Sequence, residues 1–408
     1  MAILAALFRA RIYVLAILAL GTAAAAWFAF RGHAVPVGAL FLSALSVALG
    51  VCLAFAHLRH AGLALIAALS PLPGMIAASL PATGLSYSEI LSLYGFATVA
   101  AACLAGDLVG LVLKERAPAD AARLALARAL LPLALGVLTP AALLAGLLFK
   151  TAATTGASAA GELAAATVSI LLFVPFGAAV VPYGETFFVR ANRARERRER
   201  LLRLLAEVVE PRWGLSLAGS ALVLAVLGWF GAWPLLARGV SPAQAAMAAA
   251  ALLAALLSAH TIGRDWREAV AATLTLAELA LMSLWLWGRA IGHLRDVAFV
   301  EIAVASGAAL LAMLLLLARS RSYRRAGDAP AVARRRALEE LGLAPYFGAA
   351  GAAAAIAPWL ILHGSLAPLA ILFLLAGLAA GLGMPAIATA LEALVPRRRS
   401  LNQLYGRG

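Results

Sequence analysis

Two acidic residues, Asp107 and Glu278, stand inside long apolar stretches of this sequence. A carboxyl group inside a lipid bilayer is costly, so such residues are usually retained for a function. Burial disfavours the charged carboxylate and allows the group to take up and release a proton, which is the chemistry of a proton relay. The alternative for Asp107 is a structural acid paired with an arginine, a hydroxyl or a backbone amide. For Glu278 it is a structural partner for Thr273, for Thr275 or for a neighbouring helix. Both acids are therefore proton-coupling candidates.

Other chemistry is sparse. Glu89, Glu162 and Glu301 lie near the ends of apolar stretches, where a carboxylate can reach water, so they are weaker candidates. The pair His57-x-x-His60 has no third metal ligand nearby, and no phosphate-binding loop, nucleophile motif or zinc motif occurs. We expect no metal, no cofactor and no enzyme activity.

The elements that must position these acids are membrane-spanning helices. The chain has 408 residues, of which 64% are hydrophobic and 13% charged, and its mean hydropathy is +0.95. Apolar runs of 18 or more residues predict spans, so the fold class is an all-α integral membrane protein with about twelve helices. The expected limits are 11–30, 35–57, 62–80, 88–113, 122–149, 161–184, 213–233, 242–260, 268–288, 297–318, 342–362 and 366–394.

The net charge of +14 is carried by short blocks between the apolar runs. This pattern indicates the positive-inside rule and not a nucleic-acid surface. With the N-terminus in the cytoplasm, only 5 of the 33 basic residues lie outside, which places both termini inside. Because 31 of the 33 are arginine, a bias of GC-rich genomes, we expect a bacterial cytoplasmic (inner) membrane.

The sequence repeats itself weakly. Matching short motifs, such as those at 26–30 and 228–232, recur at offsets of 202 to about 212 residues. Six helices per half keep the same orientation, so the halves would be parallel repeats. The predicted organisation is a first half over 1–184, an amphipathic connector helix over 185–212, a second half over 213–396 and a basic tail over 397–408. The basic segment 319–336 is expected to be a second solvated connector.

The motif around Asp107 resembles the membrane domain of the resistance–nodulation–division (RND) superfamily, particularly its lipid-exporting, MMPL-like branch. The motif residues stand in the family's order and spacing: Gly106, Asp107, Lys114, Glu115, Arg116, Asp120-Ala121, Leu138, Thr139 and Pro140. The resemblance implies that Asp107 is the proton-relay aspartate of helix four. It also implies a transporter for lipids or other amphipathic molecules.

The chain departs from that family in two places. Its short loops at 31–36 and 231–242 stand where the family inserts large porter domains outside the membrane. The repeat also places Asp107 opposite residues near 312–314, which are Ala, Met and Leu, so the second relay acid is missing. A protein partner could replace the porter domains.

Three hypotheses follow. The first is a compact RND-like transporter for a lipid or another apolar or amphipathic envelope molecule, with proton coupling through Asp107. The second is a scaffold or accessory subunit that does not transport. The third is a major-facilitator transporter, for which the segment GRDWRE at 263–268 is a weak match to the family signature. The expected partners are membrane lipids and a small-molecule substrate, with no nucleic acid.

Overall fold

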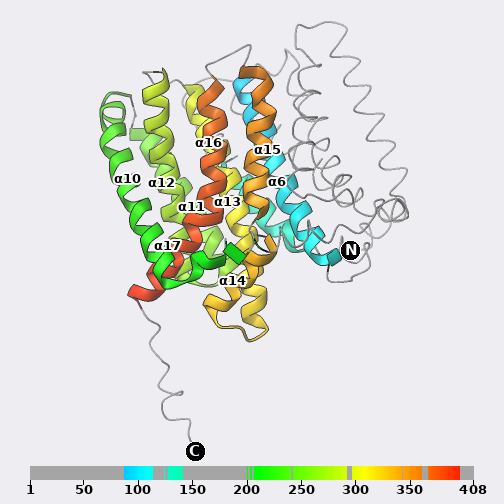
Figure 1. Ribbon diagram of the computed structural model, residues 1–408. Helices are drawn as coiled ribbons and strands as arrows, with labels where there is room; N and C mark the ends of the chain where they lie inside the picture. Colours follow the sequence, from blue (N-terminus) through cyan, green and yellow to red (C-terminus); the bar gives the residue numbers. More distant parts are fainter. Residues whose placement is uncertain are drawn as a thin grey trace, which may run out of the picture.

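The computed structural model describes residues 87–113, 127–140, 206–239, 242–291, 296–341, 343–360 and 366–395, together with the single positions 124, 200, 203 and 204. Every regular element in these ranges is a helix, as Figure 1 shows, which confirms the all-α class for this part of the chain. The total number of spans and the side on which the termini lie remain predictions.

Apolar runs form the helices at nearly the expected positions. The elements are α6 (Tyr87–Leu113), an unlabelled helix (Ala127–Pro140), η3 (Glu207–Val209), α10 (Pro211–Gly239), α11 (Pro242–Gly263), α12 (Trp266–Ile291), α13 (Asp296–Arg325), α14 (Pro330–Leu341), α15 (Leu343–Leu360), α16 (Ala367–Leu378), η5 (Ala379–Gly383) and α17 (Met384–Leu394). Five stretches in the described ranges are long and apolar enough to cross a membrane. The chain is therefore a multi-pass membrane protein.

Helix α13 forms the centre of the bundle. It contacts α6, α11, α12, α14 and α16, and 94% of its most apolar window is buried inside the protein. Its apolar residues surround the helix on all sides, a pattern that favours a position between other helices. The helix Ala127–Pro140 approaches α13 closely, because a Cβ added at Gly136 would lie 2.9 Å from the Cβ of Leu311.

Helix α10 lies at the edge of the bundle and runs parallel to α12 (Figure 1). Only 11% of its apolar window is buried, and it exposes large side chains such as Leu227 and Phe230. In a bilayer these side chains face lipid, where apolar exposure has no cost. Glycines allow α10 to approach α12, since a Cβ at Gly231 would collide with Trp285.

A π-helix, η5, joins α16 to α17 within one continuous helical span. The wider turn lies directly before Met384 and Pro385. Pro385 has no backbone N–H and its ring crowds the preceding turn, which explains a local widening at this position. A Cβ at Gly381 would collide with the ring of Tyr346 in α15, so the widened turn is packed tightly against its neighbour.

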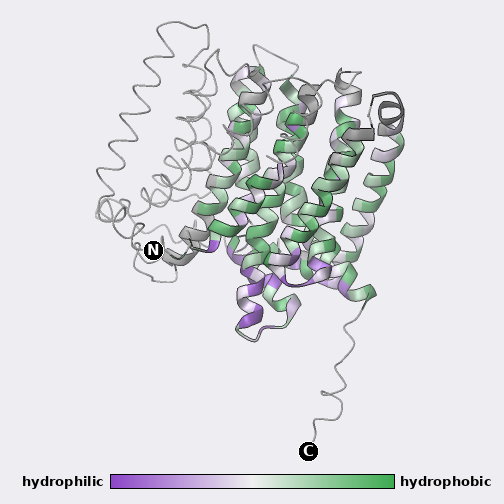
Figure 2. Ribbon diagram, turned by 180° about the vertical axis from the view of Figure 1, so that it is seen from behind, coloured by the Kyte–Doolittle hydropathy of each residue, from purple (hydrophilic) through white to green (hydrophobic). Residues whose placement is uncertain are grey.

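Two segments differ from the predictions. Helix α13 continues to Arg325, and α14 folds back along it after a turn in which Gly327 has a φ of 101°, so 319–336 is a packed helical hairpin and not a solvated connector. Its arginines form ion pairs inside the protein, which is the physical reason for the difference. Figure 2 shows that hydrophilic residues gather at this end of the apolar bundle. In addition, α10 extends to Gly239, so most of the predicted loop 231–242 is helical.

The described end of the connector 185–212 contacts the bundle. Element η3 packs against α10, α14 and α17, and Ala206 and Val209 are buried there. Leu204, which the sequence places on the apolar face, is 59% exposed. The rest of the predicted amphipathic helix lies outside the described residues.

Candidate functional site

Asp107 and Gly106 lie on α6, as expected for helix four of the predicted bundle. The side chains of both residues, and that of Glu89, lie outside the part of the chain that the structure describes. The same holds for the whole of Lys114, Glu115, Arg116 and Glu162. The relay role of Asp107 therefore stays a prediction, although α6 does contact α13, the helix that the repeat places opposite it.

The position opposite Asp107 in the repeat is buried and apolar. Ala312, Met313 and Leu314 are at most 2% exposed, in the middle of α13. This stretch of α13 therefore carries no acid and is packed as an apolar part of the core. Any proton carried at this level depends on α6 or on another helix.

Thr139 and Pro140 are the last described residues of the helix Ala127–Pro140. The Thr139 hydroxyl donates a hydrogen bond to the backbone carbonyl of Leu135 at 2.9 Å, so its proton is used within its own helix. Pro140 packs on α13, because a Cβ added at Gly307 would lie 2.6 Å from the Pro140 Cγ. In this structure the two motif residues serve helix packing.

Glu278 lies in the middle of a membrane span. It follows Trp266 by 12 residues and precedes Trp287 by 9 within the span Trp266–Trp287. At 1.5 Å per residue it lies about 18 Å and about 14 Å from these two ends. The hydrocarbon core of a bilayer is about 30 Å thick, so Glu278 lies near its midplane. The side chain is partly buried.

Glu278 has no hydrogen-bond or ion-pair partner among the described residues. One structural alternative predicted from the sequence is a bond with Thr273 or Thr275, and another is a partner on a neighbouring helix. Those hydroxyls instead donate to the carbonyls of Ala269 and Ala271, at 2.9 and 2.8 Å, and so have no proton left for the carboxylate. The threonine alternative is therefore wrong.

The neighbouring helix α10 offers no polar group at this level. Gly228 lies against Met282, where a Cβ would be 3.4 Å from the sulfur, and Gly231 lies against Trp285. The two helices are parallel, so this register places Leu224 beside Glu278. Leu224 is apolar and 46% exposed. On the side of α10, the carboxyl group of Glu278 therefore has an apolar neighbour.

Glu301 differs from its predicted environment. The sequence suggests that it can reach water near the end of its span, yet it is only 4% exposed. It is also engaged in a polar or electrostatic interaction. Glu301 lies on α13, and the helices packed around α13 shield its side chain from water. In this structure Glu301 is a buried acid that interacts with another group.

A second group of charges lies at the hydrophilic end of the bundle. We call it the Glu268 cluster; its members are Asp265, Glu268, Ser320, Arg324, Arg334 and Glu392. These residues come from the α11–α12 turn and from α12, α13, α14 and α17. The cluster therefore ties four helices together.

Glu268 is the centre of this cluster and is 0% exposed. Its carboxylate accepts hydrogen bonds from Arg324 Nη2 at 2.7 Å and from Ser320 Oγ at 3.2 Å, and Arg334 Nη1 lies 3.8 Å away. Arg334 also pairs with Glu392 on α17. A buried charge is tolerated only when it is paired and hydrogen-bonded, and Glu268 meets both conditions.

Arginines of α13 also close the end of α11. Arg324 Nη2 donates to the carbonyl of Gly263 at 2.6 Å, while its Nη1 pairs with Asp265 at 3.1 Å. Arg321 Nη1 donates to the carbonyls of Thr261 and Ile262 at 3.3 and 3.1 Å. Cations at a helix C-terminus satisfy its free carbonyls and its dipole. These contacts are structural.

Sequence reasoning missed this cluster. Asp265 and Glu268 belong to the segment GRDWRE, which the sequence linked only to a major-facilitator signature. The usable signal was two acids at the start of a span, together with arginine blocks at 319–325 and 334–336. What the sequence could not supply is the fold-back of α14, which brings Arg334 to Glu268.

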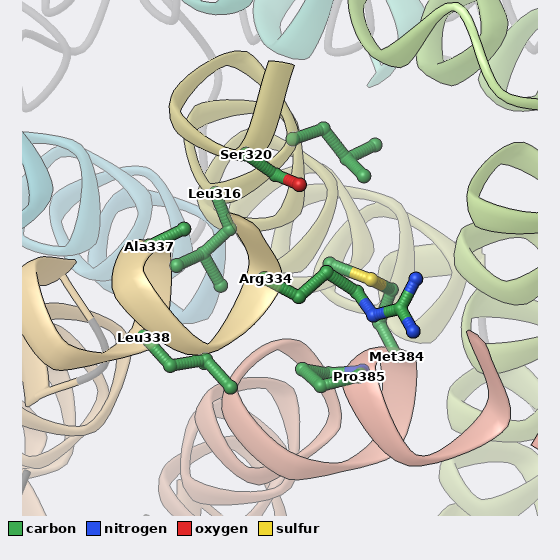
Figure 3. A pocket seen from close by; sticks show the side chains of 8 residues that line it. Leu316, Ser320, Arg334, Ala337, Leu338, Met384 and Pro385 are labelled. Atoms are coloured by element: carbon green, nitrogen blue, oxygen red, sulfur yellow. The ribbon is translucent and has the colours of Figure 1, made fainter. Parts of the chain in front are cut away.

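One small pocket adjoins the cluster (Figure 3). It lies between α13, α14 and α17, and its wall includes Leu316, Ala337, Met384 and the side chain of Arg334. Its exposed lining is almost entirely apolar, and it has room for about one water molecule. Such a site fits neither a substrate nor a cofactor.

Comparison with solved structures identifies the fold. No protein family model and no curated protein sequence matches the chain. A crystal structure of SecDF in its super-membrane-facing form superimposes with a TM-score of 0.60 and 13% identity over 91% of this chain. A crystal structure of SecDF from Thermus thermophilus, a translocon-associated membrane protein, superimposes with a TM-score of 0.59 and 14% identity over 89% of this chain.

The chain covers 63% of the length of each SecDF chain. At this identity the similarity establishes the fold. The chain therefore shares its fold with SecDF, and the RND resemblance predicted from the Asp107 motif stays a proposal. The narrower resemblance to the lipid-exporting branch stays a proposal.

Proposed function

We propose that this chain is a compact proton-coupled transporter, and not an enzyme, in a bacterial cytoplasmic membrane. Its substrate would be a lipid or another apolar or amphipathic envelope molecule. The observation that carries the proposal is Glu278, an acid near the bilayer midplane of an RND-like fold with no partner among the described residues. An uncompensated acid at this depth is stable when protonated and can release its proton when a path to water opens.

In this mechanism a single conformational change moves both the proton and the substrate across the membrane. Asp107 on α6 and Glu278 on α12 would each take up a proton from one side and release it to the other. A substrate that enters from the bilayer between helices needs no porter domain. A proton shifts the equilibrium between two conformations only if it binds one of them more tightly, and acids that are shielded in one state and open to water in the other would provide that difference.

The test uses the purified full-length chain in liposomes with an imposed pH gradient. A fluorescent phospholipid analogue serves as the probe, and its movement between leaflets is followed with a membrane-impermeant quencher. We expect gradient-driven movement that an uncoupler abolishes and that Glu278→Gln and Asp107→Asn each reduce at least tenfold. The variant Glu339→Gln, which alters an exposed acid on α14, is the matched control. Full activity in both acid variants would exclude this mechanism.

A second function is favoured by the apolar position at Met313. The RND resemblance implies a second relay acid there, and the structure has a side chain that is 0% exposed and fully packed. A scaffold or accessory subunit that keeps the fold without the pump would have this property. It would carry no proton current alone and would copurify with a protein partner in fixed stoichiometry.

A further inference from the structure

The guanidinium of Arg267 is buried, and two of its three nitrogen atoms lack a hydrogen-bond acceptor among the described residues. The residue is 6% exposed, and the two atoms without an acceptor in the described part of the chain are Nε and Nη1. The flanking acids are already committed, since Asp265 and Glu268 both pair with Arg324. Nearly all buried polar groups in proteins are hydrogen-bonded, so an exception at a surface-facing helix end indicates a site for an additional ligand.

The immediate surroundings of Arg267 favour an anion. Its Cζ lies 5.5 Å from the ring centre of Trp266, the first residue of α12, so the guanidinium is held at the start of this 26-residue helix. Asp265 Oδ1 accepts the backbone N–H of Arg267 at 3.1 Å and satisfies one of the free donors of the first turn. The remaining donors and the helix dipole add positive potential at the same point.

The site lies at the edge of a membrane span. Trp266 begins the span Trp266–Trp287 and is 50% exposed, as is usual for tryptophan at the boundary between lipid headgroups and acyl chains. The arginine-rich hairpin of α13 and α14 lies at the same end of the bundle, which the charge distribution assigns to the cytoplasm (Figure 2). Arg267 is thus at the level of phosphate groups in the inner leaflet.

The helix surface beyond Arg267 suits an acyl chain. Leu274 follows Arg267 by seven residues, or two helical turns, and so lies on the same face of α12. It is 48% exposed. A cation at headgroup level and an exposed leucine about 10 Å deeper match the two parts of a phospholipid.

We propose that Arg267 and Trp266 form a binding site for the phosphate group of an anionic membrane lipid. The headgroup reaches the guanidinium by displacing the half-exposed indole ring, and the acyl chain lies along Leu274. The evidence for this site is independent of the proposed transport, because it concerns only the start of α12.

The test measures lipid binding to the full-length chain in detergent by native mass spectrometry, with phosphatidylglycerol as the probe and phosphatidylcholine as the neutral reference. We expect Arg267→Gln to weaken phosphatidylglycerol binding about tenfold, which corresponds to about 1.4 kcal/mol. The matched control is Arg264→Gln, an exposed arginine three residues earlier in the same turn, which should change binding less than twofold. Arg267→Lys keeps the charge and should restore part of the affinity.

Three results would overturn the site. One is an equal loss in Arg264→Gln, which would indicate general surface charge. The second is unchanged phosphatidylglycerol binding in Arg267→Gln. The third is binding of inorganic phosphate, without lipid, that is as strong as the binding of phosphatidylglycerol. Should Arg267→Gln fail to fold, Arg267→Lys replaces it: phosphatidylglycerol binding that is weaker than in the unaltered chain but still stronger than phosphatidylcholine binding supports the site, and any other result contradicts it. Proton flux is not the readout, so failure here leaves the transport proposal standing.

Discussion

Replacing Glu268 by glutamine should destabilise the protein strongly, because this residue centres a buried ion-pair cluster. The substitution preserves size and the contact with Ser320 but removes the negative charge between two arginines, Arg324 at 2.7 Å and Arg334 at 3.8 Å. Breaking a buried pair costs about 3–5 kcal/mol. Arg324 keeps Asp265 and Arg334 keeps Glu392, so we expect the lower end of that range, about 3 kcal/mol.

The assay is unfolding of the purified chain in mixed micelles by titration with a denaturing detergent. The control is Glu339→Gln, which removes an acid from an exposed i,i+4 pair with Arg335, where the two side chains are 38% and 48% exposed. Such a pair contributes at most about 0.5 kcal/mol. Equal loss of stability in the two variants would refute the view that burial of the Glu268 cluster fixes the end of the bundle.

Two predictions on glycine positions, one on helix packing and one on backbone conformation, use the same unfolding assay. Gly231→Ala should cost about 1–3 kcal/mol, because the new methyl group overlaps Trp285 at the α10–α12 contact. Gly219→Ala on the same helix is its control, since its Cβ would have nothing within 4 Å, and it should be neutral or slightly stabilising. Gly327→Ala should cost about 1 kcal/mol because φ is 101° in the turn between α13 and α14, and an unchanged midpoint would contradict that reason.

The helices of the described region could be predicted because their signal is local. Helix α12 begins at Trp266, two residues before its predicted limit, and α17 ends at Leu394, the predicted limit. Length and composition suffice for such elements, since the bilayer fixes how long a span must be. The same signal fails at α13, where the helix continues seven residues beyond the predicted end into a charged segment.

The charged hairpin was not predictable by this reasoning, because its stability comes from contacts distant in sequence. Arg334 and Glu268 are 66 positions apart, and nothing in either segment indicates the other. The positive-inside rule accounts for arginines near the end of a span by the side of the membrane on which they lie. Because this rule already explained the arginine blocks, there was no reason to expect ion pairs there. By contrast, the position of Glu278 within an apolar stretch could be predicted from the sequence. The structure adds that Thr273 and Thr275 donate their hydrogen bonds to backbone carbonyls and not to Glu278.

The central claim is that the intramembrane carboxyl of Glu278 carries protons. Its most direct test is proton movement into liposomes that contain the purified chain and a trapped pH-sensitive dye, after a rapid pH jump outside. We expect protein-dependent proton entry that falls at least tenfold in Glu278→Gln and is unchanged in Glu339→Gln. Proton entry at the full rate in Glu278→Gln, from protein that is folded and inserted, would contradict the claim.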